Sequence, residues 1–412
     1  MSRLKTLLDE LCPDGVEYKK LGELGTFYGG LSGKSKEDFK DGNAKYITYM
    51  NVFSNIAVNT NIHDYVRVGE KEKQNAVKYG DVLFTGSSET PEECGMSSVL
   101  TEEVEEKLYL NSFCFGFRFY DPSIMLPGFA KFLFRSHAMR KQIIRTANGV
   151  TRFNVSKKKM ESVIIPVPPL AVQCEIVRLL DNFAELTAEL TAELSLRRTQ
   201  YEHYRDTLLT FPAADEAEKL STTSVRWLRL EDIAINCDSK RKPIAKRNRQ
   251  AGQYPYYGAS GLVDYVKEYI FDGDYLLVSE DGANLLARNT PIAFSISGKT
   301  WVNNHAHVLK FADYDMRRYV EFYLNSIDLT RYISTAAQPK LTQDNLNKIM
   351  IPIPGTNKES SAKQIHKIVS ILDRFDMLCN DLTAGLPAEI EARRKQYAYY
   401  RDRLLTFREK RA

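Results

Sequence analysis

The chain has 412 residues, with 57 lysine and arginine residues against 53 aspartate and glutamate residues, a formal net charge of +4. At about 150 residues per domain, this length allows two or three domains. Hydrophobic residues make up 43% and charged residues 27% of the chain, which is ordinary for a globular protein and excludes disorder over most of its length. The mildly basic balance permits nucleic-acid binding but does not argue for it alone.

No apolar stretch approaches the roughly 18 residues that a membrane-spanning helix needs. Four leucines near the start fall at helical spacing with acids between them, and they form no continuous apolar run like that of a signal peptide. The six cysteines are scattered and include no C-x-x-C pair, which favours free thiols. We therefore expect a cytoplasmic protein without membrane association.

A long internal repeat organises the chain. Residues 196–211 (LRRTQYEHYRDTLLTF) and 392–407 (ARRKQYAYYRDRLLTF) match at eleven of sixteen positions without a gap. The period of about 190 to 209 residues is far longer than a solenoid unit of roughly 20–50 residues, so we interpret it as a duplicated half-molecule. The match extends upstream through I-P-x-P and L-D-x-F segments, at 165–168 and 180–183 in the first half and at 351–354 and 372–375 in the second.

Each half begins with aromatic and β-branched runs between turn signals, which predicts short strands and loops. Apolar periodicity then predicts a helix, at 129–145 and at 316–335. Ser156 and Thr342 are suited to cap a short helical turn before a proline-containing strand and a long helix. We place a first globular domain at 1–155, a first helix at 156–211, a linker at 212–224, a second globular domain at 225–340 and a second helix at 341–412.

The long helices have coiled-coil spacing, because their apolar residues recur at alternating intervals of three and four. The first, from about 172 to 209, would be roughly 57 Å long at 1.5 Å per residue. The second half has four more residues between its phenylalanine and arginine landmarks, and Gly385 and Pro387 lie in that stretch. We therefore expect the second helix to be kinked or broken there.

Three features together resemble one protein family: the I-P-x-P strand, the I-V-x-x-L-D-x-F run, and the Q-Y-x-x-Y-R-D-x-L-L-T-F ending of each long helix. The opening L-C-P-D-G-V-E-Y at 11–18 is also typical. Over essentially its whole length the chain resembles the specificity subunit of type I restriction–modification systems. The resemblance implies an α+β fold with an internal pseudo-twofold repeat: two mixed α/β target recognition domains joined by two long antiparallel coiled-coil helices.

The same resemblance implies a non-catalytic subunit that reads a bipartite site in double-stranded DNA. Its helices would set the spacing of the two recognition domains and dock two methyltransferase subunits, and translocating endonuclease subunits would join that complex. No cofactor is expected on this chain, since S-adenosylmethionine would sit on the methyltransferase, into which the target adenine would be flipped. The alternative is a coiled-coil scaffold that assembles partners without reading sequence.

Candidate DNA contacts are side chains able to bind phosphates or the edges of bases. In the first half they are Lys34 and Ser35 in a glycine-rich loop, Ser87 and Ser88 after a Gly-Asp strand, and Asn148 and Arg152 before the short capped helix. In the second half they are Lys240, Arg241, Lys242, Lys246 and Arg247 in a basic loop, Glu280 and Asn284 after a Gly-Asp strand, Asn303 and His305, and Lys340. The basic loop could instead be a solvated surface, and the segments around 148–152 and 338–340 could be helix-end turns.

Three further features could suggest a nucleotide, metal or catalytic site, and none of these sites is predicted. The segment 29–35 (GGLSGKS) has Tyr28 where a P-loop requires glycine, so a nucleotide site is not predicted. His305 and His307 would share one face of a strand, but no cysteine or carboxylate cluster accompanies them, so no metal site is predicted. The sequence has no glycine-rich loop suited to S-adenosylmethionine and no catalytic constellation, so no catalytic residue is assigned.

The repeated Q-Y-x-x-Y-R-D helix ends have two interpretations. They could form the seam of the coiled coil with solvated charges, or a docking surface for methyltransferase helices, and both could apply on different faces. The candidate docking residues are Tyr201, Tyr204, Leu208, Tyr397, Tyr400 and Leu404.

Overall fold

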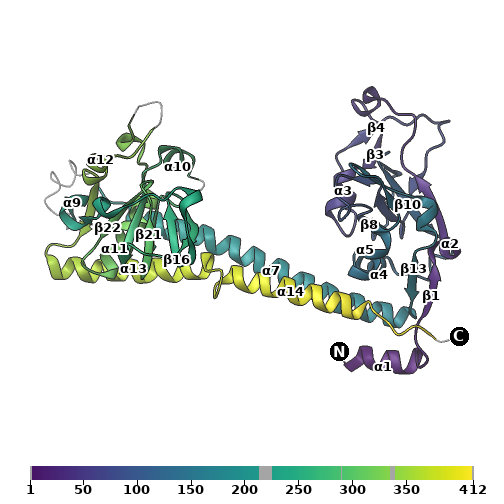
Figure 1. The fold of residues 1–412 in the computed structure, drawn as a ribbon. Helices are drawn as coiled ribbons and strands as arrows, with labels where there is room; N and C mark the ends of the chain where they lie inside the picture. The colour runs from purple at the N-terminus through teal and green to yellow at the C-terminus, as the bar shows by residue number, and fades with distance from the viewer. Residues whose placement is uncertain (1, 213–224, 289, 335–338, 411–412) are drawn as a thin grey trace. The chain divides into compact units, whose positions relative to one another are not determined.

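The computed structural model describes residues 2–212, 225–288, 290–334 and 339–410 (Figure 1). By internal contacts the chain divides into unit 1, residues 1–190 with 390–412, and unit 2, residues 191–389. This division cuts α7 (Leu170–Leu209) and α14 (Leu386–Leu404), so each unit contains the end of a long helix from the other half. The domain limits expected at 155 and 340 stay predictions.

Unit 1 combines short strands with short helices. Its strands are β1 (Glu17–Lys20), β2 (Gly25–Gly29), β3 (Ala44–Ile47), β4 (Tyr65–Val66), β5 (Ala76–Val77), β6 (Val82–Thr85), β7 (Ser87–Ser88), β8 (Ser97–Val99), β9 (Leu108–Leu110), β10 (Cys114–Phe119), β11 (Ala147–Asn148), β12 (Phe153–Val155) and β13 (Ile164–Val167). Its helices before α7 are α1 (Ser2–Leu11), α2 (Leu21–Leu24), α3 (Tyr49–Ser54), α4 (Pro127–Leu133), α5 (His137–Ile144) and α6 (Lys157–Met160).

Unit 2 has the same kind of composition. Its strands are β14 (Val225–Arg229), β15 (Ile235–Asn236), β16 (Ala251–Gly258), β17 (Gly261–Val266), β18 (Phe271–Asp272), β19 (Tyr275–Ser279), β20 (Ala293–Ile296), β21 (Lys299–Val302), β22 (Ala306–Lys310) and β23 (Met350–Pro354). Its helices are α9 (Leu230–Ile233), α10 (Gly282–Ala287), α11 (Tyr314–Ser326), α12 (Gln343–Asn347) and α13 (Lys358–Asn380).

Three sheets of unit 1 recur in unit 2, whereas the three-stranded sheet β11-β12-β7 has no counterpart among the described residues of unit 2. The order β2-β10-β6-β8 in unit 1 corresponds to β15-β22-β19-β20 in unit 2, and β4-β3-β9-β5 corresponds to β17-β16-β21-β18. In each of the latter two sheets one pair is parallel, β3 with β9 and β16 with β21. The two-stranded sheets β1-β13 and β14-β23 also correspond, and both contain the predicted proline-containing strand. The structure therefore confirms the α+β class and the internal repeat.

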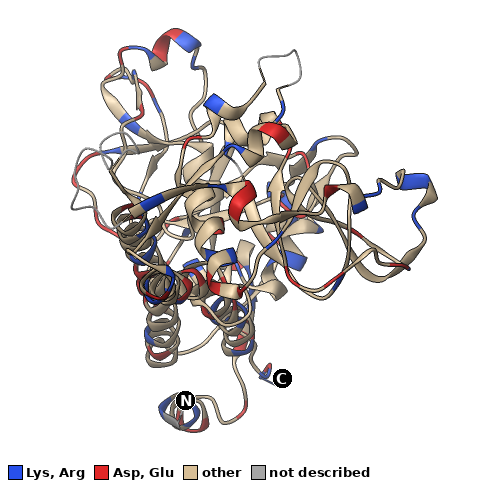
Figure 2. Ribbon diagram, turned by 90° about the vertical axis from the view of Figure 1, so that its left-hand side faces the viewer, with Lys and Arg blue, Asp and Glu red and all other residues tan. Residues whose placement is uncertain are grey.

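The long helices agree with the periodicity of the sequence. α7 has 40 residues, or about 60 Å at 1.5 Å per residue. Both acidic and basic residues lie on these helices (Figure 2), as expected of a solvated outer face. Within the described residues, no helix is long and apolar enough to cross a membrane.

The second long helix is broken where the sequence predicted it. α13 ends at Asn380 and α14 begins at Leu386. A Cβ atom at Gly385 would lie 2.5 Å from the carbonyl oxygen of Met377, so only glycine fits this close backbone approach. Pro387 lies in the first turn of α14, where its missing N–H is tolerated.

Within unit 2 the two long helices run antiparallel. The ring of Tyr204 in α7 stacks on that of Phe375 in α13, with centroids 5.4 Å apart. Burial raises the pKa of Cys379, one turn later in α13, and the nearby charge of Arg198, earlier in α7, opposes that shift. Residue numbers therefore rise along one helix as they fall along the other.

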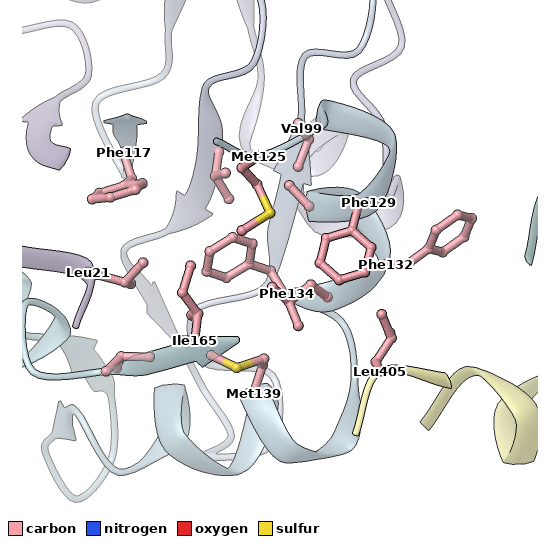
Figure 3. Close-up of a cluster of buried hydrophobic side chains, with 14 of the residues drawn as sticks. Leu21, Val99, Phe117, Met125, Phe129, Phe132, Phe134, Met139, Ile165 and Leu405 are labelled. Carbon is pink, nitrogen blue, oxygen red and sulfur yellow. The ribbon is translucent and has the colours of Figure 1, made fainter. Parts of the chain in front are cut away.

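The core of unit 1 includes the end of the chain. Phe117 of β10 and Phe129 and Phe132 of α4 are at most 1% exposed, and Leu405, just after α14, is 3% exposed. Figure 3 shows Leu405 beside the α4 phenylalanines, in the same cluster of buried side chains. Burying a side chain of this size contributes about 1.5–3 kcal/mol, so residues 390–410 stabilise a fold that begins at the N-terminus.

The boundaries predicted for the helices of the globular parts were wrong in both halves. The helix expected at 129–145 is two helices, because the Ser136 hydroxyl accepts from the Met139 N–H at 3.4 Å and caps a new helix, α5. The helix expected at 316–335 ends at Ser326, and residue 335 lies outside the described residues. The predicted caps Ser156 and Thr342 are confirmed, at the starts of α6 and α12.

All six cysteines are free, as their scattered positions in the sequence predict.

Candidate nucleic-acid interface

Three separate segments of unit 1 meet at the end of β6. The Gly86 N–H donates to the Phe113 carbonyl at 2.7 Å, which ties the loop after β6 to the segment before β10. β7 pairs with β12, which brings Ser87 and Ser88 beside the segment before α6. The Arg152 guanidinium donates to the Ser87 hydroxyl at 3.2 Å and lies 5.9 Å from the centre of the Phe113 ring. We call Ser87, Ser88, Phe113 and Arg152 the unit 1 cluster.

The unit 1 cluster borders a hollow of about 620 Å³. Phe113 and Met50, which both line it, are each 59% exposed, which is unusual for large apolar side chains. The hollow thus combines three aromatic rings, hydroxyls, one cation and two acids. Its remaining walls are formed by Tyr49, Phe53, Glu89, Glu93 and Thr151.

The same three segments meet in unit 2. The Glu280 N–H, after β19, donates to the His305 carbonyl, before β22, at 2.9 Å. The Glu280 carboxylate accepts from Arg241 at 3.0 Å and from the Lys340 ammonium, before α12, at 3.2 Å. We call Arg241, Glu280, His305 and Lys340 the unit 2 cluster. Sequence candidates from segments far apart in the chain are therefore brought together in both units.

The Glu280 carboxylate is held in its charged form. Burial alone would raise its pKa, but the bonds to Arg241 and Lys340 hold that pKa below its usual range. Arg241 also donates to the Ala306 carbonyl at 3.0 Å, so its guanidinium is fixed inside unit 2. The unit 2 cluster therefore presents one acid between two cations.

The two histidines of the H-x-H motif lie in different surroundings. His305 precedes β22 and is exposed, whereas His307 is 1% exposed. His307 Nδ1 lies 2.6 Å from Asp238 Oδ2, and its Nε2 lies 2.7 Å from the Leu341 carbonyl oxygen. His307 is thus a satisfied core residue, and the expectation that both histidines share one strand face is wrong. Asn303 is buried and accepts from the His305 N–H at 2.8 Å. Across the described ranges no group of three or more metal-ligating side chains occurs.

The basic loop after β15 is anchored from within. The Ile244 N–H donates to the Tyr256 hydroxyl at 3.1 Å, and the Trp301 indole donates to the Lys242 carbonyl at 2.5 Å. The Arg249 guanidinium lies 4.4 Å from the centre of the Tyr256 ring. These contacts fix the backbone of the loop while using only one of its cationic side chains.

Apart from Arg249, the basic loop has five cations, and only Arg241 among them is held inside unit 2. Arg241 belongs to the unit 2 cluster, with its side chain 14% exposed. The four remaining cations are exposed, and within the part of the chain that the structure describes none of them forms an ion pair. They are Lys240, Lys242, Lys246 and Arg247.

Both candidates in the glycine-rich loop of unit 1 are engaged within the unit. The Lys34 ammonium donates to a Glu72 carboxylate oxygen at 2.6 Å, and its side chain is 8% exposed. This bond, with others from Gln74 and the backbone, lowers the pKa of Glu72 to about 2. The Ser35 hydroxyl donates to Asp38 at 2.9 Å and helps to close a single helical turn. Phosphate binding by either side chain stays a prediction.

Three further candidates also have local partners. The Ser88 hydroxyl donates to the Thr90 carbonyl, and Asn148 accepts from the Lys159 ammonium at 2.7 Å. Asn284 accepts from a threonine hydroxyl at 2.5 Å, while its buried amide nitrogen has no hydrogen-bond partner within the described residues. DNA contact by these side chains stays a prediction.

The helix-end residues pack inside their own units. In unit 1, Tyr400 stacks on Phe183 with centroids 5.4 Å apart, as Tyr204 stacks on Phe375 in unit 2. These contacts favour the coiled-coil seam as one role of the repeated motif. Tyr204 still leaves 41% of its surface exposed, and docking of a methyltransferase stays a prediction. The others pack against the hydrophobic cores: Tyr397 and Leu404 in unit 1, and Tyr201 and Leu208 in unit 2.

Sequence reasoning missed Phe113 and Met50 at the hollow. A signal for Phe113 existed, because the repeat aligns residues 111–119 with 303–311 and so places Phe113 opposite the candidate His305. Met50 gave no such signal, since an exposed methionine in a short helix has no distinctive pattern.

One family model matches both halves of the chain. The model of the type I restriction modification DNA specificity domain matches residues 13–196 and again 225–392. The chain belongs to this family. The two matches coincide with the two copies of the repeat, each with most of the long helix that follows it.

Individual relatives agree. The chain is 34% identical over 284 residues to the EcoR124I/EcoR124II specificity subunit of Escherichia coli. This match covers 62% of this chain and 64% of that protein. It is 36% identical over 222 residues to the EcoprrI specificity subunit of the same species, covering 53% and 52%. The chain thus spans about half to two thirds of the length of these relatives. A chain solved for the structural basis of complex assembly and conformational transition of the type I R-M system matches 95% of this fold at a TM-score of 0.57 and 14% identity, with 97% of that chain covered.

Proposed function

We propose that this chain is the DNA-recognition subunit of a type I restriction–modification complex. Each unit would read one half of a bipartite double-stranded site, and the long helices would dock two methyltransferase subunits. The observation that carries the proposal is the convergence of the same three segments into the unit 1 cluster and the unit 2 cluster. Both clusters hold side chains that can contact base edges.

Phosphate contacts would come from the basic loop of unit 2. Four exposed cations on an anchored backbone suit a polyanion, because little ordering is needed when they bind. Phosphate contacts would fix orientation on the duplex, and the clusters would supply sequence discrimination. Two reading sites on one chain predict two half-sites with a set spacer between them.

The chemistry of modification would belong to the partners. The target adenine would be flipped into a methyltransferase subunit carrying S-adenosylmethionine, and translocating endonuclease subunits would join the complex in the cytoplasm. This chain would contribute binding and positioning and no catalytic group. The rival reading is a scaffold whose helices assemble partners without sequence recognition.

Base modification in the source cell tests the proposal directly. Modified adenines are mapped across the genome of the wild type, of a strain lacking this gene, and of that strain with the gene restored. We expect methyladenine at one interrupted motif to vanish on deletion and to return on restoration. A reconstituted complex that assembles but binds interrupted-motif and scrambled duplexes equally would overturn the proposal in favour of a scaffold.

A further inference from the structure

We propose that Arg152 and Phe113 form the base-reading element of unit 1, and that Arg152 reads a guanine in the half-site contacted by this unit. The inference rests on the proposed DNA-recognition function and extends it to named side chains and a named base. It follows from how Arg152 is held, from the chemistry of the hollow beside it, and from a comparison of the two clusters.

Arg152 is oriented but not neutralised. Its guanidinium makes one hydrogen bond, to Ser87 at 3.2 Å, and rests near the Phe113 ring. A guanidinium has five N–H donors, so most of them stay open. No carboxylate lies within 4 Å of Arg152 among the described residues. Such an arrangement reduces the entropy lost on binding while leaving a pair of donors free for a ligand.

Three other arginines of unit 1 serve the fold. Arg118 pairs with the buried Asp81 at 2.6 Å. Arg135 and Arg140 are largely enclosed and donate to backbone carbonyls. Arg152, by contrast, is exposed and lines the hollow. Its donors therefore face a space that a ligand could enter.

The hollow suits the edge of a base pair better than a phosphate. Glu89 and Glu93 stand in its wall and would repel a phosphate. A G·C pair offers complementary groups in the major groove: guanine O6 and N7 accept two bonds from an arginine, and the cytosine amine donates to a carboxylate. Phe113 and Met50 supply apolar surface for the neighbouring pair, such as the methyl group of a thymine.

Comparison of the units points the same way. The convergence of three segments is retained, yet these segments carry Ser87, Phe113 and Arg152 in unit 1 and Glu280, His305 and Lys340 in unit 2, where Arg241 joins them from the basic loop. Phosphates are the same in every half-site, whereas bases differ. A place where the repeat keeps the backbone and changes the side-chain chemistry is therefore where different bases would be read.

The test uses this chain assembled with its methyltransferase subunits. Duplexes with one randomised half-site are selected for binding at fixed salt and sequenced, for the wild type and for Arg152→Ala, Arg152→Gln and Phe113→Ala. Arg67→Ala is the matched control, because it removes an exposed arginine of unit 1 that does not line the hollow. Thermal unfolding of each complex confirms that the variants are folded.

We expect Arg152→Ala to reduce the preference for guanine at one position by about 5- to 150-fold and to leave the other positions unchanged. Arg152→Gln should move that preference towards adenine, since glutamine pairs with adenine N6 and N7. Phe113→Ala should weaken discrimination at the same or the adjacent position, and Arg67→Ala should leave the whole profile intact.

Two results would overturn the inference while leaving the proposed function standing. One is an unchanged profile for Arg152→Ala. The other is a uniform loss of affinity for all sequences with a salt slope smaller by about 1, which would make Arg152 a phosphate contact. A wild-type complex with no sequence preference at all would instead refute the proposed function.

Discussion

The outward cations of the basic loop should control the salt dependence of DNA binding. The variant that tests this replaces four residues together by alanine: Lys240, Lys242, Lys246 and Arg247. Each phosphate contact contributes about 0.9 to the slope of log affinity against log salt, so four contacts would contribute up to about 3.6. Between 50 and 200 mM salt, the wild-type complex should therefore lose up to roughly 150-fold more affinity than the variant.

Fluorescence anisotropy of a labelled duplex, titrated with the assembled complex at several salt concentrations, measures this slope. Replacing Lys267 and Lys310, two exposed lysines of unit 2 outside the basic loop, controls for the loss of charge alone. A slope that is unchanged in the fourfold variant, or that falls equally per charge in the control, would refute phosphate binding by this loop.

Arg241 should behave differently from its neighbours in the sequence. Its guanidinium is bonded to Glu280 and to the Ala306 carbonyl, so Arg241→Ala leaves a largely buried carboxylate with Lys340 as its remaining cation. The expected effect is a less stable unit 2, because a buried charge that loses a partner is costly. A folded Arg241→Ala variant with a reduced salt slope would contradict this assignment.

Three further outcomes are expected. Leu180→Ala and Leu372→Ala each empty a fully buried site on a long helix, and each should lower the free energy of unfolding by about 2.7–5 kcal/mol, measured by urea denaturation. A double-mutant cycle on the stacked rings of Phe183 and Tyr400 should give a coupling of about 0.5–1.5 kcal/mol. Burial alone would raise the pKa of Asp238, but its bonds to His307 and to a backbone N–H, with the nearby charge of Arg241, hold that pKa below its usual range. The wild type should therefore be more stable than Asp238→Asn by the full amount above the unfolded pKa of about 3.9. That difference in stability should shrink as the pH falls through the lower folded pKa.

The features that could be predicted from sequence depend on near neighbours along the chain. Ser156 and Thr342 cap helices because each hydroxyl accepts from an N–H three residues later. Gly385 marks the break because the backbone is tightly packed there. The correspondence of the two units followed from the repeat, since two similar segments fold alike, and the antiparallel helices followed from the family resemblance.

The features that could not be predicted depend on partners distant in sequence. Nothing local distinguishes Arg241 from Lys242, yet one points to Glu280 and the other to solvent. Lys34 is a phosphate candidate in a glycine-rich loop, and its partner within unit 1, Glu72, is 38 positions away in the sequence. Side-chain direction in loops is set by such distant contacts, which is why the fold was predictable and the site only partly so.

The repeat also separates structural positions from reading positions within a single chain. Lys131 on α4 pairs with Asp181 on α7 at 2.8 Å, and Arg318 on α11 pairs with Asp373 on α13 at 2.8 Å. The same contact, between a domain helix and a long helix, persists because both units must solve the same packing problem. The clusters keep the convergence of three segments but differ in their side chains, with Ser87, Phe113 and Arg152 in unit 1 and Glu280, His305 and Lys340 in unit 2. Different half-sites would require such a difference, so side-chain variation within the clusters is what two readers of unlike sequences on one framework should show.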